Sequence, residues 1–193
     1  LPAALTADAP LGQLIGCASV GSRLSIVFPT TEDAAAQYYV LDVLDVVPTA
    51  AWGEEQAPVA GMPVVTLDDD GAPTVEIPDA AAPTEVQISV KQGDGIAVGD
   101  GDTTLLQYHG VGWETGETFD SSWAKGAPIT SEGNGYVPGF VQALAGQKVG
   151  SQVLVVVPPA AGYGEGEIND EDLKGQTLVF VIDILATMHP AAA

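Results

Sequence analysis

Three stretches of this 193-residue chain alternate in side-chain character and predict its longest β-strands. They are Thr103–Val111, Ser151–Val157 and Gln176–Ala186. Because successive side chains of a strand point to opposite faces, an alternating run offers one face for burial. In the third stretch the residues on one face are Leu178, Phe180, Ile182 and Ile184. We therefore expect Phe180 to point toward the apolar side of a sheet.

Shorter extended runs come before the long strands, each bounded by Asp, Gly or Pro residues that are typical of turns. They are Val64–Leu67, Thr74–Ile77 and Val86–Val90. One helix is predicted at Gly139–Ala145, where Phe140 and Leu144 lie one turn apart and Gly146 suits the C-terminal cap. No helices alternate with the strands, so the predicted class is α+β, an antiparallel sheet curled around one short helix.

The chain also repeats part of itself. Val20–Pro29 resembles Val149–Pro158, and Tyr39–Leu44 resembles Phe180–Leu185. The segment between the two blocks is shorter in the first copy, which lacks the loop that contains Tyr163 in the second. The first copy is therefore degenerate.

This repeat predicts four parts of the chain. Residues 1 to 47 form the C-terminal half of a degenerate module, 48 to 60 a linker rich in Pro, Ala and Glu, 61 to 187 a complete domain, and 188 to 193 a tail. A half module cannot cover both faces of its sheet, so we expect it to borrow a partner surface or to be partly disordered. Because the chain starts without Met and inside this pattern, we also expect upstream sequence, where any targeting signal would lie.

Charge and cysteine content exclude several classes of function. Five Lys and Arg residues against 26 Asp and Glu give a formal net charge of −21, which argues against binding to phosphate backbones. A single cysteine, Cys17, excludes an intramolecular disulfide and a zinc site built from Cys pairs. No apolar run is long enough to span a bilayer. The acidic run at Asp68–Gly71 lacks EF-hand spacing and is interpreted as a solvated turn.

A series of short motifs follows Tyr108. In order they are Gly116–Trp123, Val137–Phe140, Val149–Ser151, Val157–Pro159, Gly162–Gly164 and Thr177–Phe180. Their order and spacing resemble the FKBP-type peptidyl-prolyl cis/trans isomerases, well over residues 61 to 187 and in part over 11 to 47. The resemblance implies an FKBP-like fold with a strongly curved sheet, isomerase activity on Xaa-Pro bonds that assists protein folding, proline-containing polypeptide substrates, and no cofactor or metal.

The resemblance also implies roles for individual residues. The walls of a proline pocket would be Tyr108, Phe119, Phe140 and Phe180. The Val137 N–H and the Tyr163 hydroxyl would donate hydrogen bonds to the substrate. Asp120 would lie at the pocket edge, accepting a hydrogen bond from Tyr108 or polarising the bound imide. A substrate-binding rim would contain Ile129, Trp123 and Ile168. Macrolides such as tacrolimus or rapamycin would be further ligands, and the acidic flap at residues 165 to 175 would weaken their binding.

The chemistry of the residues agrees with this activity. Rotation about a prolyl bond breaks no bond and faces a resonance barrier of roughly 18 to 20 kcal/mol. An apolar pocket that removes water, with oriented donors, favours the twisted amide without a nucleophile or metal. Tyr163 between two glycines is typical of a functional loop. Taken singly, Tyr108 or Phe180 would be interpreted as core, and Trp113, Trp123 and Tyr136 as packing or rim residues.

Two other classes of function stay open. The first is a non-catalytic FKBP scaffold that binds peptides or acts as a chaperone, which the missing loop favours for the first copy. The second is a calcium or metal protein that uses the acidic turns, for which no ligand spacing matches. A degenerate module before an intact one, in an acidic chain, resembles multi-module FKBPs of high-GC actinobacteria. That resemblance implies export or association with the cell envelope and leaves a cytoplasmic location open.

Overall fold

The computed structural model describes residues 13, 15–16, 18–31, 34–44, 46–57, 59–132, 135–168 and 172–189. Cys17 and the last four residues of the predicted tail lie outside these ranges. The chain divides into two compact units, residues 1–47 and 48–193. Each unit is described by itself.

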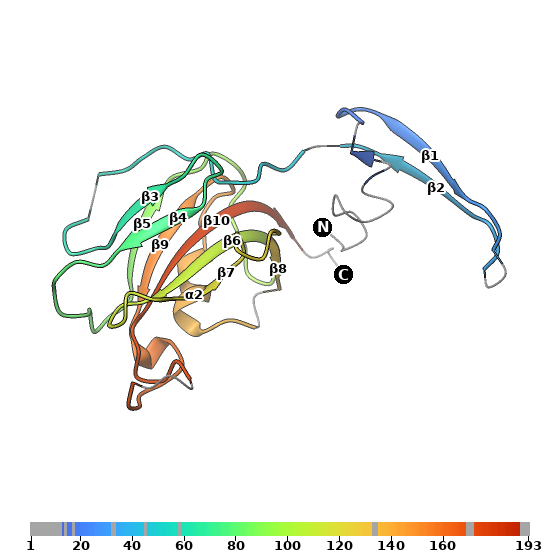
Figure 1. Ribbon diagram of the computed structural model, residues 1–193. Coiled ribbons are helices and arrows are strands. Elements are labelled where there is room, and N and C mark those ends of the chain that lie inside the picture. Colours follow the sequence, from blue (N-terminus) through green and yellow to red (C-terminus); the bar gives the residue numbers. More distant parts are fainter. Residues whose placement is uncertain are drawn as a thin grey trace. The chain divides into compact units, whose positions relative to one another are not determined.

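The second unit is built on one antiparallel sheet (Figure 1). Its strands pair in the order β5, β9, β10, β6, β7, and β8 pairs with β6 beside β7. The strand bounds are Gln87–Lys91 for β5, Thr103–Gly112 for β6, Thr118–Ser121 for β7, Ile129–Ser131 for β8, Gln152–Val157 for β9 and Leu178–Met188 for β10. The predicted α+β class and antiparallel sheet are confirmed.

Helix α2, Pro138–Leu144, packs on one face of this sheet. Its apolar side, Phe140, Ala143 and Leu144, is buried in the main core. Gly139 allows the close approach, because a Cβ atom there would lie 2.5 Å from a methyl carbon of Val157 on β9. Pro138 opens the helix, where a missing N–H costs nothing, and Gly146 follows its end with φ +74°.

A second apolar cluster covers the other face of the sheet. It joins Met62 and Trp113 to Val156 of β9 and Val179 of β10. Val75 of the short hairpin β3 (Val64–Leu67) and β4 (Pro73–Glu76) packs against it. The central strands are therefore buried on both faces. Successive side chains along them point alternately into the main core and into the second cluster, rather than into a core and into solvent. The predicted face of Leu178, Phe180, Ile182 and Ile184 is confirmed as the main core.

The segment that precedes Gly61 lies on the second unit, although its composition predicts a linker. The N–H groups of Trp52 and Gly53 donate to the carbonyl of Gly150 at 3.2 and 2.8 Å, and the N–H of Ala51 donates to the carboxylate of Asp183 at 2.7 Å. The Trp52 ring covers Gly150, where a Cβ atom would lie 2.5 Å from the indole. We call residues 48–57 the strap. The strap shows no apolar periodicity in its sequence, because it is held largely by backbone hydrogen bonds, which do not depend on the type of side chain.

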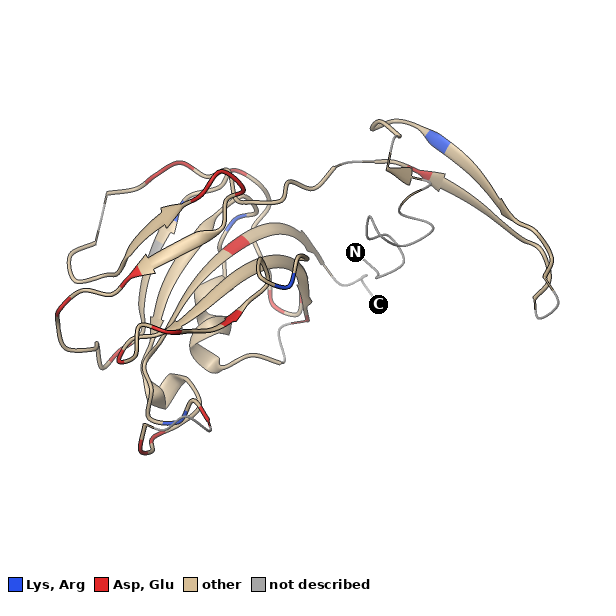
Figure 2. Cartoon of the chain, in the orientation of Figure 1, with Lys and Arg blue, Asp and Glu red and all other residues tan. Residues whose placement is uncertain are grey.

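In the first unit, two strands form an antiparallel hairpin, β1 at Arg23–Phe28 and β2 at Gln37–Asp42. Its register matches the sequence repeat: Arg23 lies opposite Asp42, as Gln152 lies opposite Asp183 in β9 and β10. The Arg23 guanidinium and the Asp42 carboxylate form two hydrogen bonds, of 2.6 and 2.7 Å, and appear as the blue and red segments of this hairpin in Figure 2. The repeat therefore predicts strand pairing as well as sequence.

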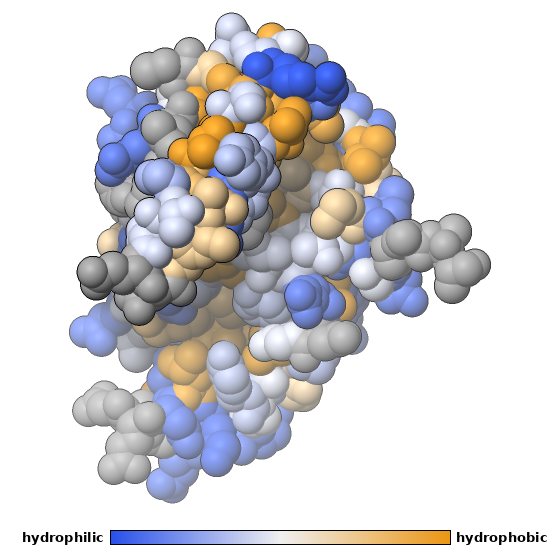
Figure 3. All heavy atoms as spheres, turned by 90° about the vertical axis from the view of Figure 1, so that its right-hand side faces the viewer, coloured by the Kyte–Doolittle hydropathy of each residue, from blue (hydrophilic) through white to orange (hydrophobic). Residues whose placement is uncertain are grey.

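Apolar side chains are exposed on this hairpin. Tyr38 and Val40 are 75% and 67% exposed, whereas their equivalents in the second unit, Val179 and Val181, are fully buried. Apolar residues are visible at the surface on the side of the molecule shown in Figure 3. The hairpin thus has the sequence of a buried element, although Tyr38 and Val40 are exposed among the described residues.

Candidate active site

A cavity of about 710 Å³ opens between the main sheet and α2. Its lining comes from β6, β7, β10, α2 and the loops beside them. The lining residues are Tyr108, Thr115, Glu117, Thr118, Phe119, Asp120, Gly135, Tyr136, Val137, Phe140, Tyr163, Ile168, Asp172, Leu173, Gln176 and Phe180. All seven residues predicted for the pocket, and Ile168 of the predicted rim, line this one cavity.

Aromatic rings build the apolar end of the cavity. Phe180 meets Phe119 and Phe140 edge to face, with ring centroids 5.5 and 5.2 Å apart. Tyr108 meets Phe140 edge to face at 6.4 Å. Edge-to-face contacts of this kind add stability beyond burial and fix ring orientation. Since Phe140 is only 1% exposed, it forms a rigid floor.

Strand register places these rings. On β10 and β6, Phe180 lies opposite Gly110 and Ile182 lies opposite Tyr108. A Cβ atom on Gly110 would lie 2.5 Å from the Phe119 ring, so this glycine makes the space that the ring of Phe119 occupies. The floor thus depends on a residue that carries no side chain.

Val137 ends the loop before α2 and is the N-cap residue of that helix. Its N–H donates no hydrogen bond to any residue in the described ranges. Because Val137 lines the cavity, this group is a donor that the fold leaves available.

Tyr163 lies on the loop after the 3₁₀ helix η2, Pro159–Ala161. It lines the cavity and is 53% exposed. Gly164, which follows it, has φ +94°, a backbone angle that favours glycine. The prediction that these glycines mark a loop rather than a core position is confirmed.

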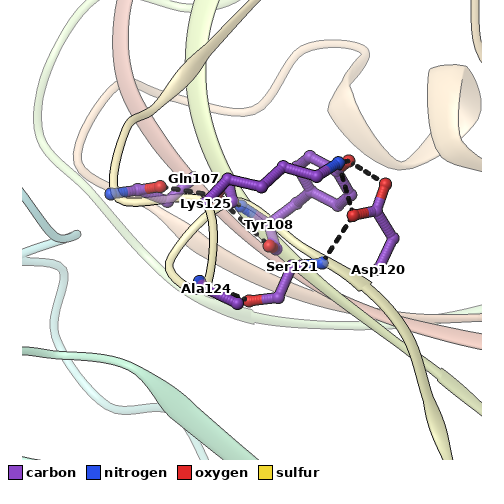
Figure 4. A network of polar contacts seen from close by, with 7 residues as sticks. Gln107, Tyr108, Asp120, Ser121, Ala124 and Lys125 are labelled. Atoms are coloured by element: carbon purple, nitrogen blue, oxygen red, sulfur yellow. Dashed lines mark hydrogen bonds and ion pairs between the residues drawn. The ribbon is translucent and has the colours of Figure 1, made fainter.

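Asp120 anchors a polar network at the cavity edge (Figure 4). Its Oδ2 accepts a hydrogen bond from the Tyr108 hydroxyl at 2.5 Å. Its Oδ1 accepts the N–H of Ser121 at 2.8 Å and lies 2.5 Å from Nζ of Lys125. Burial raises the pKa of the Asp120 carboxyl, but the hydrogen bonds from Lys125, Tyr108 and Ser121 outweigh it and hold this pKa below its ordinary value. The group is therefore a carboxylate at neutral pH.

The same network raises the pKa of Tyr108. Burial is the main cause, and the hydrogen bond to the Asp120 carboxylate adds to it, while Lys125 opposes both. The phenol thus keeps its proton and remains the donor of the 2.5 Å bond. The Tyr108 backbone is fixed as well, because its N–H donates to Oγ of the buried Ser122 at 2.8 Å.

Sequence reasoning missed Lys125 and gave Tyr136 no more than a packing or rim role. The signal for Lys125 was its isolation, since it is the one cationic residue between Lys91 and Lys148 in an acidic chain. Tyr136 lines the cavity and stacks on Phe140, with centroids 4.6 Å apart and planes 16° apart. It enlarges the aromatic floor beside Val137.

Two residues predicted for the rim, Trp123 and Ile129, are not among the residues that line the cavity. Ile129 lies on β8 and packs against the main core. Trp123 lies in the turn after β7, and its indole N–H is buried without a hydrogen-bond partner in the described ranges. Their place in a larger substrate contact stays a prediction.

Neither a metal centre nor a membrane span is found in the part of the chain that the structure describes. No three His, Cys, Asp or Glu side chains in these ranges are grouped to hold a metal ion. None of the helices there is long and apolar enough to cross a bilayer.

The chain is similar to several known proteins. The family described as "FKBP-type peptidyl-prolyl cis-trans isomerase" matches residues 95–185. A "Probable FK506-binding protein" of Corynebacterium glutamicum is 38% identical over 115 residues, 59% of this chain and 97% of the relative. An "FK506-binding protein" of Streptomyces anulatus is 36% identical over 118 residues, 59% of this chain and 95% of the relative. The isomerase FkpA of Escherichia coli is 32% identical over 96 residues, 50% of this chain and 35% of the relative.

Proposed function

The chain belongs to the FKBP-type peptidyl-prolyl cis-trans isomerase family, and we propose that its cavity catalyses rotation about Xaa-Pro peptide bonds of extended or unfolded polypeptides. The observation that carries the proposal is the convergence of seven motif residues on one cavity. They come from separate elements, β6, β7, α2, β10 and the loop after η2. As an isomerase the protein would assist the folding of its substrates.

The aromatic end supplies the environment that this reaction needs. A planar amide carries a larger charge separation than the twisted amide, so removal of water from the prolyl carbonyl favours the twisted form. Phe119, Phe140 and Phe180 would surround the proline ring and exclude water there. No covalent step is required, because the barrier arises from amide resonance alone.

Oriented donors would hold the twisted carbonyl. The Val137 N–H would bind the carbonyl that follows the proline, and the Tyr163 hydroxyl would be the second donor. Asp120 would keep the Tyr108 ring in place and present a carboxylate to the bound imide region. Lys125 would act through Asp120 as a positioning residue.

The test is the cis/trans exchange rate of short Xaa-Pro peptides, measured by NMR exchange spectroscopy with and without the protein. We expect acceleration by the natural chain, loss of most of it in Phe180→Ala and a smaller loss in Tyr163→Phe. Tyr38→Phe is the matched control, since it removes the hydroxyl of an exposed tyrosine on β2. A folded protein that accelerates no peptide would overturn the proposal.

For the first unit we propose a half module without catalysis. Its hairpin has the register of β9 and β10 but no equivalent of the Tyr163 loop. Its exposed Tyr38 and Val40 favour a role as a peptide-binding or docking surface. The exposure of these two side chains favours a non-catalytic binding function for the first unit alone.

Two further parts of the proposal rest on resemblance. Relatives are named for FK506, and we propose that the aromatic end also accepts such macrolides, which calorimetric titration with tacrolimus would test. Export or association with the cell envelope stays a prediction.

A further inference from the structure

The cavity continues beyond the aromatic rings to a polar end. On β6, Tyr108, Gly110 and Gly112 share one face, and successive members lie about 7 Å apart. The aromatic rings occupy the levels of Tyr108 and Gly110. At the level of Gly112, the side-chain oxygens of Thr115 and Gln176 lie 2.5 and 2.9 Å from the position that a Cβ atom would take.

We call the group Thr115, Glu117, Thr118, Asp172 and Gln176 the polar end of the cavity. All five line it. Two of them come from the turn between β6 and β7, and two from the loop before β10. The polar end therefore lies between two loops, one strand step past the ring of Phe180.

Among the residues that the structure describes, every charged one that lines the cavity is acidic, namely Glu117, Asp120 and Asp172. Lys125 pairs with Asp120, and Nζ of Lys174 lies 3.5 Å from Asp172. The Glu117 carboxylate forms no ion pair within the described ranges. Of the three, Glu117 is the carboxylate without a cation of its own.

The backbone of Glu117 is well fixed. Its carbonyl accepts the N–H of Gly112 at 3.0 Å, and its N–H donates to Oγ1 of Thr115 at 3.2 Å. The turn therefore fixes the main chain from which the Glu117 side chain projects at the polar end.

The neighbouring loop adds to the negative potential. Its described residues include Glu165, Glu167 and Asp172 and one lysine, Lys174, and in Figure 2 the loop between η2 and β10 shows red segments beside a single blue one. In a chain of net charge −21, a cation near this opening meets an attractive field from both sides.

Building on the proposed isomerase function, we propose that the polar end binds a lysine or arginine side chain that directly precedes or directly follows the substrate proline. The aliphatic stem would pass Ile168 and the ring of Phe180, and the cationic group would reach Glu117 and the oxygens of Thr115 and Gln176. Glu117 is thus a specificity-determining residue, and the preferred substrates are basic prolyl segments.

The test uses two series of peptides. In the first, only the residue directly before proline differs, and it is Lys, Gln or Glu. In the second, the residue directly after proline is varied in the same way. We expect kcat/KM to fall in the order Lys, Gln, Glu, with about fivefold between Lys and Glu peptides at low salt. The ratio should shrink as salt rises from about 0.02 to 0.5 M, because the charges are exposed.

Two variants locate the preference. Glu117→Gln removes the charge at the polar end, and Glu76→Gln removes one exposed charge from β4, outside the cavity. We expect the Lys-to-Glu ratio to drop at least twofold in Glu117→Gln and to stay within error in Glu76→Gln. A ratio near one in the natural chain, or equal ratios in both variants, would overturn the subsite. The neutral Gln peptide separates the two proposals, since its catalysis supports the isomerase whichever way the charged peptides behave.

Discussion

Nζ of Lys125 lies 2.5 Å from Oδ1 of Asp120, an ion pair that joins the turn after β7 to the cavity edge. The same carboxylate accepts the Tyr108 hydroxyl, and Nζ of Lys125 also donates to that hydroxyl at 3.4 Å, so Lys125 helps to set the position of this aromatic wall. The pair links surface charge to the shape of the pocket.

Loss of Lys125 should therefore change the titration of Asp120. The pKa of Asp120 lies below the ordinary value of an aspartate, and that ordinary value is about 3.9. Its carboxylate stabilises the fold above that ordinary value, and this contribution is lost as pH falls through the depressed pKa. In Lys125→Gln we expect the pKa to rise toward or above the ordinary value, because burial remains and the largest opposing interaction is gone. Carboxyl ¹³C NMR titration measures this pKa.

The control is Lys148→Gln, which removes an equal charge elsewhere and should leave the pKa of Asp120 unchanged. Equal shifts in both variants would contradict the local explanation.

Gly110 should be essential to the pocket rather than to the sheet. In Gly110→Ala the new methyl group would overlap the Phe119 ring, so the ring must leave its place against Phe180. We expect a loss of isomerase activity on the order of tenfold or more, with a stability cost of about 1 to 3 kcal/mol. Urea unfolding and peptide exchange measure the two effects. Gly99→Ala is the control, since its methyl group would meet its nearest neighbours at 3.4 Å, and similar losses in both variants would argue against a specific role of the ring.

The strap should determine where a stable second unit can begin. A chain that starts at Pro48 keeps the hydrogen bond from Ala51 to Asp183 and the cover of Trp52 over Gly150. A chain that starts at Gly61 loses both and leaves a buried carboxylate short of one donor. We expect the shorter chain to be less stable by about 1 to 3 kcal/mol, as measured by urea unfolding. Equal stability of the two chains would show that the strap is a linker after all.

Asp183 should make stability depend on pH in the direction opposite to Asp120. Burial raises its pKa, and the hydrogen bonds from Ala51 and Gln152 offset this in part. A raised folded pKa gives a contribution that is present below the unfolded value and is lost as pH rises through the folded value. Relative to the natural chain, Asp183→Asn should therefore gain stability as pH rises above the ordinary pKa of an aspartate, about 3.9. Denaturant unfolding above this pH tests it against Glu76→Gln, which removes an exposed charge. A difference that does not vary with pH would contradict the raised pKa.

Much of the fold followed from local patterns. The long strands and the helix were placed within about two residues, because the alternation of the strands, the spacing of Phe140 and Leu144, and Gly146 are local signals. Strands β7 and β8 were not predicted. They have four and three residues, and both are defined by their pairing with β6, a contact between segments that the local sequence does not show.

The pocket residues were predicted from the order of motifs, and the structure brings all seven together. Lys125 and the polar end were not predicted, because both depend on loops that meet only after the strands have paired. The strap was interpreted as a linker for the same reason, since its hydrogen bonds go to Gly150 and Asp183, about 100 and 130 residues away.

The sequence by itself determined the α+β class, the repeat and the aromatic residues of the cavity, because these depend on the identity and spacing of residues along the chain. Once the structure has given the register of β9 and β10, the repeat also accounts for the register of β1 and β2. Only the tertiary structure decided that Glu117 faces a polar end, that Lys125 holds Asp120 and that Gly110 makes room for Phe119. These are contacts between segments that are distant in sequence, and their geometry is set by strand register and close packing rather than by any local preference.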